Sequence, residues 1–272
     1  MQTKPTESPM LRILILTALP QEYAPLKKLI PGWRRLTWRP YKSFLVPLPG
    51  RRIVLMECGM GGDSVRNALE RGRAELNPDV VVFAGFAGGL HPSLVVGDVC
   101  VVRDALLSDS LRGNAETVAS FSLGLGPEFS KFVSDKALKC ISAVTAPQPE
   151  NKTALAARLG NRPAALDMET AFVAEIACRD GLAFVCFRAV SDGLSDDLGF
   201  DVAEISDSKG NVKISRVLGT ILRNPFVLGA YYRAWRRSRD AAENLCRVLT
   251  AFLDIPVGSM RRIKESALVA RV

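Results

Sequence analysis

The stretch ALDMETAFVAEIACRDGLAFVCFRAVSD, residues 165–192, joins two apolar runs through a helical pattern. That pattern covers residues 169–180 and stops at Gly181, a residue type that commonly follows the last turn of a helix. Residues 183–190 are apolar at nearly every position, which is typical of a strand covered on both faces. The stretch therefore predicts a strand, a helix and a strand, with two acids and a methionine at residues 167–169, where the first strand becomes the helix.

Other runs of the same kind recur along the chain, and they alternate with helical patterns. The runs that predict strands are residues 12–17, 43–48, 52–58, 79–85, 98–102 and 140–145. The patterns that predict helices are residues 22–29, 63–76 and 129–139. This alternation predicts an α/β fold, a three-layer α/β/α sandwich around a largely parallel sheet. In such sheets ligands bind beyond the carboxyl ends of the strands, so functional residues are sought there.

The length and composition suit one large domain with a filled core, since 48% of the 272 residues are hydrophobic. We expect a loose polar leader over residues 1–10, a single domain over residues 11–255 and a tail over residues 256–272. Within that domain, residues 214–255 are expected to form a helical C-terminal extension, interrupted at Asn224-Pro225.

The chain is basic, with 36 Lys and Arg against 28 Asp and Glu and a net charge of +8. Such a charge favours anionic partners, or it serves only to keep the surface soluble. No helix-turn-helix, zinc or RNA-recognition signature is present, so nucleic-acid binding is not expected.

The cysteines and the apolar runs indicate a cytoplasmic protein. The six cysteines contain no C-x-x-C pair, which is typical of reduced, buried thiols. The apolar run after Arg12 is short and lacks a cleavage site, so it predicts a core strand instead of a signal sequence. No run approaches the roughly 20 apolar residues of a membrane span.

His91 is the sole histidine, so acid–base chemistry must rest mainly on carboxylates, cysteine or tyrosine. The sequence contains no G-x-S-x-G motif, which argues against a serine hydrolase. One imidazole among scattered carboxylates and thiols does not support a metal site either.

Three acids stand at the ends of predicted strands: Glu22, Glu169 and Asp192. A single acid there is often only a helix cap or a first-turn residue that complements the helix dipole. Three acids on the same rim of one sheet favour a functional site. Two glycine-rich turns, CGMGG at 58–62 and AGFAGGL at 84–90, lie on that rim, although neither matches a P-loop or a dinucleotide-binding motif.

The order of these motifs resembles the nucleoside phosphorylase superfamily, and within it the 5'-methylthioadenosine/S-adenosylhomocysteine nucleosidase branch. The resemblance rests on ILILTALPQE at 13–22, ECGMGGDSVRNALE at 57–70, NPDVVVFAGFAGGLHPSLVVGDVCVV at 77–102 and the stretch at 165–192. It covers residues 11–192 and is weak from 106 to 163. It implies a mixed central sheet, cleavage of the N-ribosidic bond of a purine nucleoside without a metal or organic cofactor, and a homodimer.

The resemblance also implies roles for individual residues. Glu22 matches the acid that activates the attacking water, and Arg188 resembles an arginine close to that water and the acids. Glu169 matches the acid that holds the ribose hydroxyls, while Met168 packs against the sugar. Asp192 matches the acid that gives a proton to N7 of the departing purine. The alternative is that Met168 is core packing and Glu169 a helix-start acid.

Three further residues are assigned to substrate binding by the same resemblance. Gly88 belongs to the A-G-x-A-G-G-L motif, and Phe86 stands where the nucleosidases usually have serine, which makes the floor of the pocket less polar. Phe200 resembles the aromatic residue that closes the 5' side of the ribose. The base-binding segment has no recognisable counterpart in AVTAPQPENK, residues 143–152, so the sequence leaves the substrate open.

The chemistry explains why these residue types are wanted. Ribosyl transfer passes through an oxocarbenium-like state, so an anion near the sugar and a proton on the leaving purine stabilise it selectively. We expect burial and neighbouring carboxylates to keep Asp192 protonated. TALPQE at 17–22 replaces the G-D-P-x-R phosphate loop of true phosphorylases, which favours water as the nucleophile.

The C-terminal region resembles the extra helices of hopanoid-associated phosphorylase-like proteins, which act on adenosylhopane. Aromatic and apolar residues could line a path for such a lipid-linked nucleoside, namely Phe226, Val227, Leu228, Tyr231, Tyr232 and Trp235. Arginines could meet lipid headgroups in a peripheral membrane contact, namely Arg233, Arg236, Arg237 and Arg239. The alternative is an ordinary amphipathic helix packed on the sheet.

The leading hypothesis from sequence is a hydrolase that releases adenine from adenosylhopane and leaves ribosylhopane. The alternatives are a methylthioadenosine/S-adenosylhomocysteine nucleosidase, a phosphate-dependent phosphorylase, and a futalosine-type hydrolase that releases hypoxanthine. A catalytically silent nucleoside-binding or membrane-associated protein is the alternative outside enzymology.

Overall fold

The computed structural model describes residues 10–108, 126–146, 151–160, 162–196 and 236–266 with their side chains, and residues 117–122, 228–235 and 267–269 as backbone. Phe200, Phe226 and Val227, three of the residues singled out above, lie outside the described part of the chain. The side chains of residues 228–235 lie outside it too.

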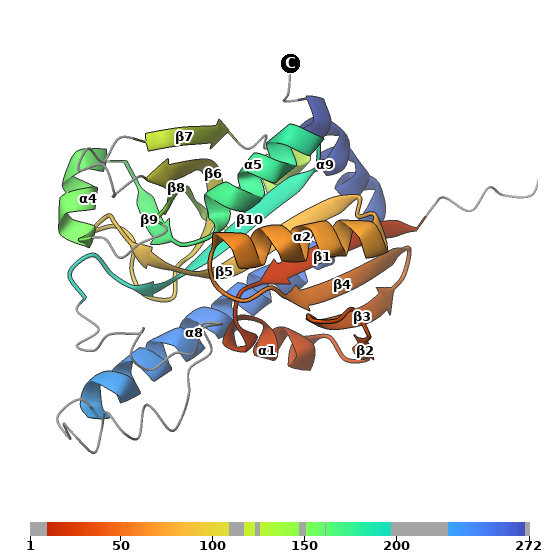
Figure 1. The fold of residues 1–272 in the computed structure, drawn as a ribbon, viewed down its shortest axis with the longest axis horizontal. Coiled ribbons are helices and arrows are strands. Elements are labelled where there is room, and N and C mark those ends of the chain that lie inside the picture. The colour runs from red at the N-terminus through yellow and green to blue at the C-terminus, as the bar shows by residue number, and fades with distance from the viewer. Residues whose placement is uncertain are drawn as a thin grey trace, which may run out of the picture.

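Ten strands form one mixed sheet in the described part of the chain (Figure 1). They are β1 (Leu11–Thr17), β2 (Arg34–Leu36), β3 (Lys42–Leu48), β4 (Arg51–Glu57), β5 (Val80–Gly89), β6 (Val99–Ser108), β7 (Thr117–Ser122), β8 (Lys139–Thr145), β9 (Ala164–Asp167) and β10 (Phe184–Asp192). Their order is β10-β6-β8-β9-β5-β1-β4-β3-β2, with β7 beside β6.

Two features of the pairing position the site. β1 is parallel to β4 and β5, and β5 is parallel to β10, so these four strands end at the same edge. β10 also pairs with β6, while β9 pairs with both β5 and β8, and the strands β5, β10, β6, β8 and β9 therefore close into a ring. The turn after β9 begins beside the end of β5, because β9 runs antiparallel to β5.

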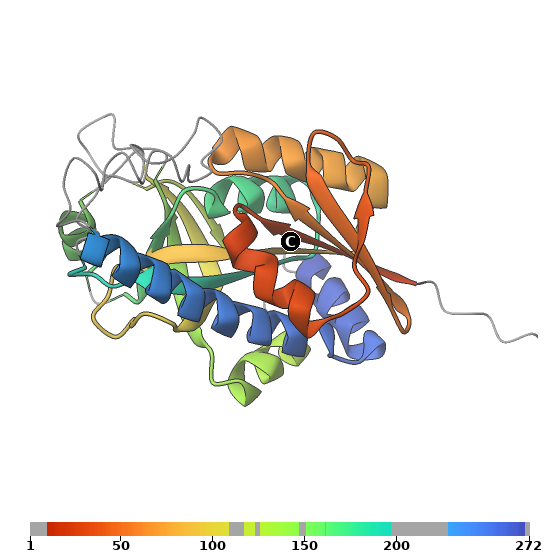
Figure 2. The same cartoon turned by 90° about the horizontal axis from the view of Figure 1, so that it is seen from below.

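Helices cover both faces of the sheet, which makes the three layers expected from the sequence (Figure 2). They are α1 (Pro20–Leu29), α2 (Gly62–Leu76), α3 (Pro127–Asp135), α4 (Lys152–Leu159), α5 (Thr170–Asp180), α8 (Leu228–Leu253) and α9 (Val257–Val269). The helices α2 and α5 lie on one face, and α1, α3, α8 and α9 lie on the other.

The core divides along the sheet because successive strand residues point to opposite faces. In β1, Leu14 and Leu16 pack with α2 and α5, whereas Ile13 and Ile15 pack with the helices of the other face. On that second face the aromatic rings of Phe129, Phe132, Phe187 and Phe252 contact one another, which ties α3 and α8 to β10. A smaller cluster under α4 contains Leu90, Leu106, Val144 and Leu155.

Several elements differ from the sequence-based expectations. α3 ends at Asp135 and not at residue 139, because Ala137 has a positive φ of 51° and the chain turns there into β8. The segment expected as a tail contains α9, whose Met260 and Ile263 are buried against the core. Cys140 and Cys178 are exposed, contrary to the expectation of buried thiols, while the other four cysteines are buried. Within the described residues, no helix is long and apolar enough to cross a membrane.

Candidate active site

The candidate site lies at the edge where the parallel strands β1, β4, β5 and β10 end. α1 follows β1 and carries Glu22, and the turn after β4 contains Gly61. Gly85 and Phe86 lie in the last part of β5. Arg188 lies on β10, opposite Gly85 in the parallel pairing of these two strands. Segments far apart in the sequence therefore meet at one edge, as ligand sites of α/β sheets do.

Glu22 lies on the first turn of α1 and is only 3% exposed. Its Oε2 accepts a hydrogen bond from the N–H of Leu19 at 2.8 Å, and its Oε1 accepts one from the N–H of Phe86 at 2.9 Å. Burial raises the pKa of Glu22, although these hydrogen bonds and Arg188 oppose the rise. A fixed carboxylate with a raised pKa is suited to take a proton from water near neutral pH.

Gly85 leaves the space in which Glu22 and Arg188 approach each other. A Cβ on Gly85 would stand 2.5 Å from Nη1 of Arg188 and 2.7 Å from Oε1 of Glu22. Only a residue without a side chain fits at that point of β5, so the first glycine of AGFAGGL is explained by packing against the two site residues.

Glu169 caps the start of α5 and reaches across to the turn after β4. Its Oε1 accepts a hydrogen bond from the N–H of Gly61 at 2.9 Å, and its Oε2 lies 4.0 Å from Nη2 of Arg188. Burial raises the pKa of Glu169 to about 7, with Arg188 lowering it and Asp167 raising it further. The two carboxylates of Glu22 and Glu169 thus flank one buried guanidinium.

Arg188 is held by a buried network that the sequence did not reveal. Its Nη2 lies 2.7 Å from Oδ2 of Asp167, and its Nε and Nη2 donate to Oγ1 of Thr170 at 3.0 and 2.7 Å. The guanidinium also stacks over Phe83, 4.2 Å from the ring centroid. Burial is the largest influence and opposes the charge on Arg188, but Asp167 and the other groups around it, among them Glu169 and Glu22, together outweigh burial and raise its pKa. Asp167 is therefore a positioning residue for Arg188, and Thr145 also donates to it at 2.6 Å.

Asp192 lies at the end of β10, four residues beyond Arg188, which is about 13 Å along a strand. The register of β10 against β5 shifts between Val190 and Asp192, an irregularity that re-aims side chains. Its Oδ1 accepts a hydrogen bond from Oγ of Ser191 at 2.6 Å, and its Oδ2 contacts Nζ of Lys152. The sequence predicted carboxylates close to Asp192, and the structure adds a group that it did not predict: the ammonium of Lys152 is in contact with Asp192.

The remaining predicted residues occupy different positions around this edge. Met168 is 41% exposed beside Glu169, so it is not core packing. Phe86 contributes its N–H to Glu22, while its side chain is half-buried and packs toward the α1 and α8 face. Gly88 lies beside Asp192, because a Cβ there would stand 3.0 Å from Oδ2 of that residue.

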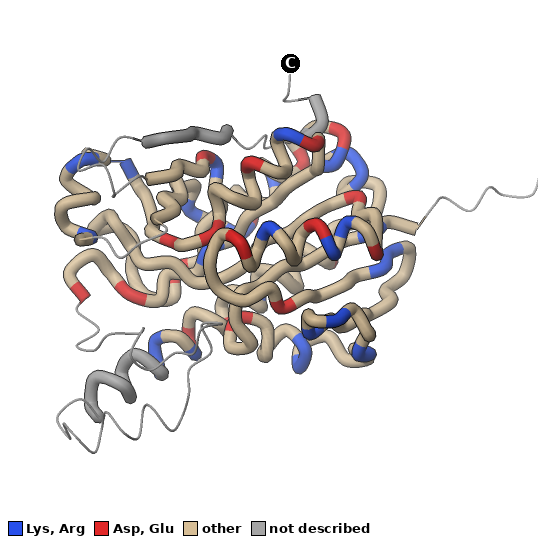
Figure 3. Tube along the Cα trace, in the orientation of Figure 1, with Lys and Arg blue, Asp and Glu red and all other residues tan. Residues whose placement is uncertain are grey.

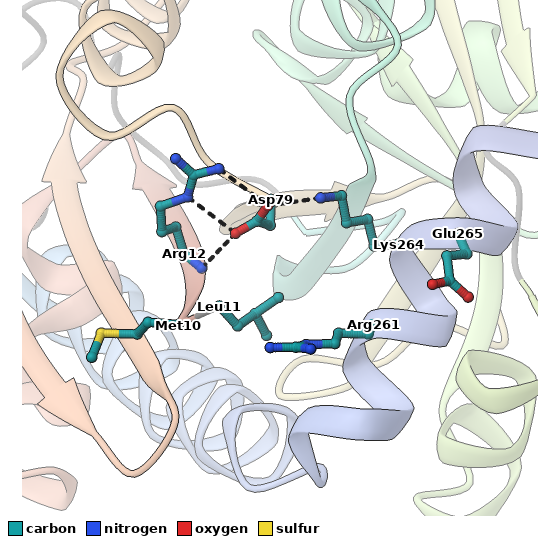
Figure 4. A pocket seen from close by; sticks show the side chains of 7 residues that line it. All are labelled: Met10, Leu11, Arg12, Asp79, Arg261, Lys264 and Glu265. Atoms are coloured by element: carbon teal, nitrogen blue, oxygen red, sulfur yellow. Dashed lines mark hydrogen bonds and ion pairs between the residues drawn. The ribbon is translucent and has the colours of Figure 1, made fainter. Parts of the chain in front are cut away.

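A separate cavity of about 650 Å³ lies at the opposite edge of the sheet (Figure 4). It opens between the start of β1 and α9, where Arg12 and Lys264 both bind Asp79. Burial works against the charge on Asp79, but these hydrogen bonds outweigh it and lower its pKa to about 2. Arg12, Lys264 and Asp79 are thus paired with one another, and the cavity is far from the strand ends that carry the candidate site.

The positive net charge is spread along the chain instead of gathering in one element. Figure 3 shows Lys and Arg interleaved with Asp and Glu on α2, α5 and α9. Arg237 and Arg239 bind Asp196 and Glu243 at 3.1 Å each. Among the residues described, no group of three or more His, Cys, Asp or Glu is arranged to hold a metal ion.

A family model described as the phosphorylase superfamily matches residues 12–223 of this chain. A 5'-methylthioadenosine/S-adenosylhomocysteine nucleosidase of Listeria welshimeri is 26% identical over 203 residues, which cover 65% of this chain and 84% of that protein.

Solved structures share the fold at lower identity. The 5'-methylthioadenosine/S-adenosylhomocysteine nucleosidase of Helicobacter pylori, with butyl-thio-DADMe-Immucillin-A, superposes with a TM-score of 0.68 at 16% identity, over 90% of this chain and 98% of that one. The futalosine hydrolase of the same organism gives a TM-score of 0.68 at 15% identity, with the same coverage. At these identities the likeness shows the fold alone.

Proposed function

The chain belongs to the phosphorylase superfamily, and from this membership and the geometry of its site we propose that it hydrolyses the N-ribosidic bond of a 5'-substituted purine nucleoside. The substrate class is that of 5'-methylthioadenosine and S-adenosylhomocysteine, after the relative of Listeria welshimeri. The observation that carries the proposal is the meeting of Glu22 and Glu169 around the buried Arg188.

In this mechanism the ribose lies beside Glu169 and Met168, and water attacks its anomeric carbon. Glu22 takes the proton of the water as the carbon–nitrogen bond breaks. Glu169 accepts hydrogen bonds from the ribose hydroxyls, and its charge stabilises the oxocarbenium-like transition state. The exposed thioether of Met168 offers the sugar an apolar, polarizable surface that needs no hydrogen bond.

Water is favoured over phosphate as the nucleophile by the environment of Glu22. The N–H groups of Leu19 and Phe86 could otherwise cradle an anion, but both donate to the Glu22 carboxylate. A phosphate at that position would meet a buried negative charge, and like charges at short range are strongly unfavourable in such a site.

Adenosylhopane is a second candidate substrate, although the comparisons favour the methylthioadenosine class. The observation in its favour is α8, a helix of 26 residues that begins beyond the matched residues 12–223. Arg237 on α8 binds Asp196 just after β10, and this contact joins the helix to the strand that carries Asp192. Arg237 and Arg239, two of the arginines considered for a membrane contact, already bind acids.

The test incubates the purified protein with 5'-methylthioadenosine, S-adenosylhomocysteine, adenosylhopane and futalosine, each with and without phosphate, and measures the free purine. We expect adenine from the first two substrates at the same rate with or without phosphate. Turnover of adenosylhopane alone supports the second candidate, hypoxanthine release from futalosine alone supports the futalosine-type reaction, and a phosphate requirement supports a phosphorylase. Release of no base by the protein refutes hydrolysis. A Glu22→Gln preparation controls for contaminating enzymes.

The homodimer and the cytoplasmic location expected from the sequence stay predictions. Sedimentation of the purified protein tests the first of these, and fractionation of cells with an antibody against the chain tests the second.

A further inference from the structure

Lys152 makes a contact at the candidate site that no motif in the sequence predicted. It is the first residue of α4, and its Nζ contacts Oδ2 of Asp192 and donates to the carbonyl of Gly193 at 3.0 Å. The lysine side chain is 20% exposed and the aspartate side chain 13% exposed, so the pair is largely withdrawn from water.

The position of this lysine is unfavourable for helix stability. The N-terminal turn of a helix carries partial positive charge, so a cation there is destabilising, and acids are preferred. α4 already has a suitable cap, because Oδ1 of Asn151 accepts a hydrogen bond from the N–H of Ala154. A lysine that violates a local preference and points inward indicates a role outside the helix.

The surroundings hold the ammonium and the carboxylate together. Ser191 donates to Oδ1 of Asp192, which leaves Oδ2 for the ammonium. Gly88 keeps the space open, because a Cβ there would stand 2.9 Å from Cε and 3.0 Å from Nζ of Lys152. Asp196, an acid four residues after Asp192, accepts the N–H of Gly193 and binds Arg237.

We propose that Lys152 is the proton reserve of the site: together with Asp192 it supplies the proton that the departing purine takes. This inference rests on the proposed function. Nζ of Lys152 contacts Oδ2 of Asp192, so a proton can pass along this contact from the amine to the carboxyl. Asp192 is then the group that hands the proton to the purine, and Lys152 is the group behind it that replaces the proton.

The proton moves from Nζ of Lys152 to Asp192, and from Asp192 to N7 of the purine, while the bond between the anomeric carbon and N9 breaks. The electron pair of that bond stays on the purine, and the oxygen of water forms the new bond to the anomeric carbon. Glu22 accepts the proton that the water loses. Exchange with solvent then returns a proton to Lys152 and removes the one on Glu22.

The decisive experiment compares two leaving groups on the same ribose. One substrate is 5'-methylthioadenosine, whose purine needs a proton to depart. The other is the 4-nitrophenyl riboside with the same 5'-methylthio group, whose nitrophenolate leaves as the anion. The variants are Lys152→Arg and Lys152→Met. Arginine keeps the ion pair but cannot release a proton in a protein, whereas methionine removes both.

We expect both variants to lose about 10²-fold or more in kcat for the nucleoside, the usual contribution of a positioned acid. Hydrolysis of the nitrophenyl riboside should stay within about threefold of the wild type. Lys131→Met, which removes a lysine from an exposed ion pair with Asp135, should change neither rate. Thermal unfolding measured on each variant reports whether the fold is retained.

Other outcomes overturn the inference. If Lys152→Arg turns over the nucleoside at the wild-type rate, the lysine gives no proton. If both substrates slow equally in a folded variant, the residue only organises the site. These results differ from a failure of the proposed function, in which the wild-type protein itself hydrolyses neither substrate.

Discussion

Oδ2 of Asp167 lies 2.7 Å from Nη2 of Arg188, and both side chains are only 1% exposed. β9 carries the acid and β10 carries the arginine, and both strands pair with β5. Removing one partner of a buried ion pair leaves a charge without compensation in a medium that solvates it poorly. The ion pair therefore couples the stability of the fold to the placement of the guanidinium between the two glutamates.

Asp167→Asn should lower the free energy of unfolding by about 3–5 kcal/mol, because it removes the nearer of the two ion-pair partners of the buried guanidinium. The measurement is urea unfolding followed by fluorescence. Asp135→Asn is the matched control, since Asp135 pairs with Lys131 at a site where its side chain is 57% exposed. That control should cost less than about 1 kcal/mol. Equal costs for the two variants would contradict the buried network.

Gly85→Ala should reduce turnover of the nucleoside by at least about tenfold and destabilise the protein by about 1–3 kcal/mol. The added Cβ would stand 2.5 Å from Nη1 of Arg188 and 2.7 Å from Oε1 of Glu22, so one of them must move. Gly258→Ala is the control, because the nearest atom to a Cβ there is 3.9 Å away in α9. Alanine favours helix, so the control should keep full activity and equal or higher stability.

Some of this architecture could be predicted because it depends on local pattern. The apolar runs and their caps predict β1, β10, α2 and α5 near their observed bounds, whereas β5 continues past its predicted end to Gly89, and parallel strands bring their carboxyl ends to one edge. β2 escaped prediction because its residues, RRL, are mostly exposed and carry no apolar pattern. α4 was not predicted either, because the helix that follows its cap, Asn151, is only 8 residues long.

The pairing of distant side chains could not be predicted in the same way. Asp167 stood out in the sequence without a role, because its contact with Arg188 depends on how two strands pair with β5. β9, which carries Asp167, is antiparallel to β5, and β10, which carries Arg188, is parallel to it. Lys152 meets Asp192 because β8, α4 and β9 return the chain to the end of β5. Such contacts arise from tertiary packing, and neither the secondary-structure propensity of a residue nor the spacing of a motif predicts them.

Glu169 should make stability depend on pH. Its pKa of about 7 in the folded protein is above the ordinary value of 4.5, so folding favours the protonated form. The stabilisation is complete below about pH 4.5 and is lost as pH rises through 7, with a total on the order of 3 kcal/mol. Glu169→Gln removes the titration, so the stability of the wild type relative to this variant should fall between pH 5 and pH 7.5. A constant difference over that range, in urea unfolding, would show that burial does not perturb this carboxyl.

Asp192→Asn should abolish base release while the fold and nucleoside binding are kept. The amide oxygen can still accept from Ser191 and Lys152, but an amide cannot take up a proton and pass it to the purine as a carboxyl does. We expect adenine release to fall at least about 10²-fold, with affinity for a non-hydrolysable nucleoside changed by less than about fivefold. Chromatography of adenine and calorimetric titration measure the two quantities. Unchanged turnover would refute the role given to Asp192.

Glu22→Gln should reduce kcat for the nucleoside and for the nitrophenyl riboside alike, by about 10²–10⁴-fold, because both need an activated water. The leaving group does not matter here, in contrast to the Lys152 variants. The amide also places an N–H₂ group against one of the N–H donors of Leu19 and Phe86, so a stability loss of about 1–3 kcal/mol accompanies it. Glu175→Gln, which removes a carboxylate from the surface pair with Arg66, controls for the loss of a glutamate and should leave both rates unchanged. In the wild type, kcat/KM should fall as pH drops through the raised pKa of Glu22, since the base must be ionised to accept the proton of water. A Glu22→Gln protein that still hydrolyses the nitrophenyl riboside at the wild-type rate would remove Glu22 from the mechanism.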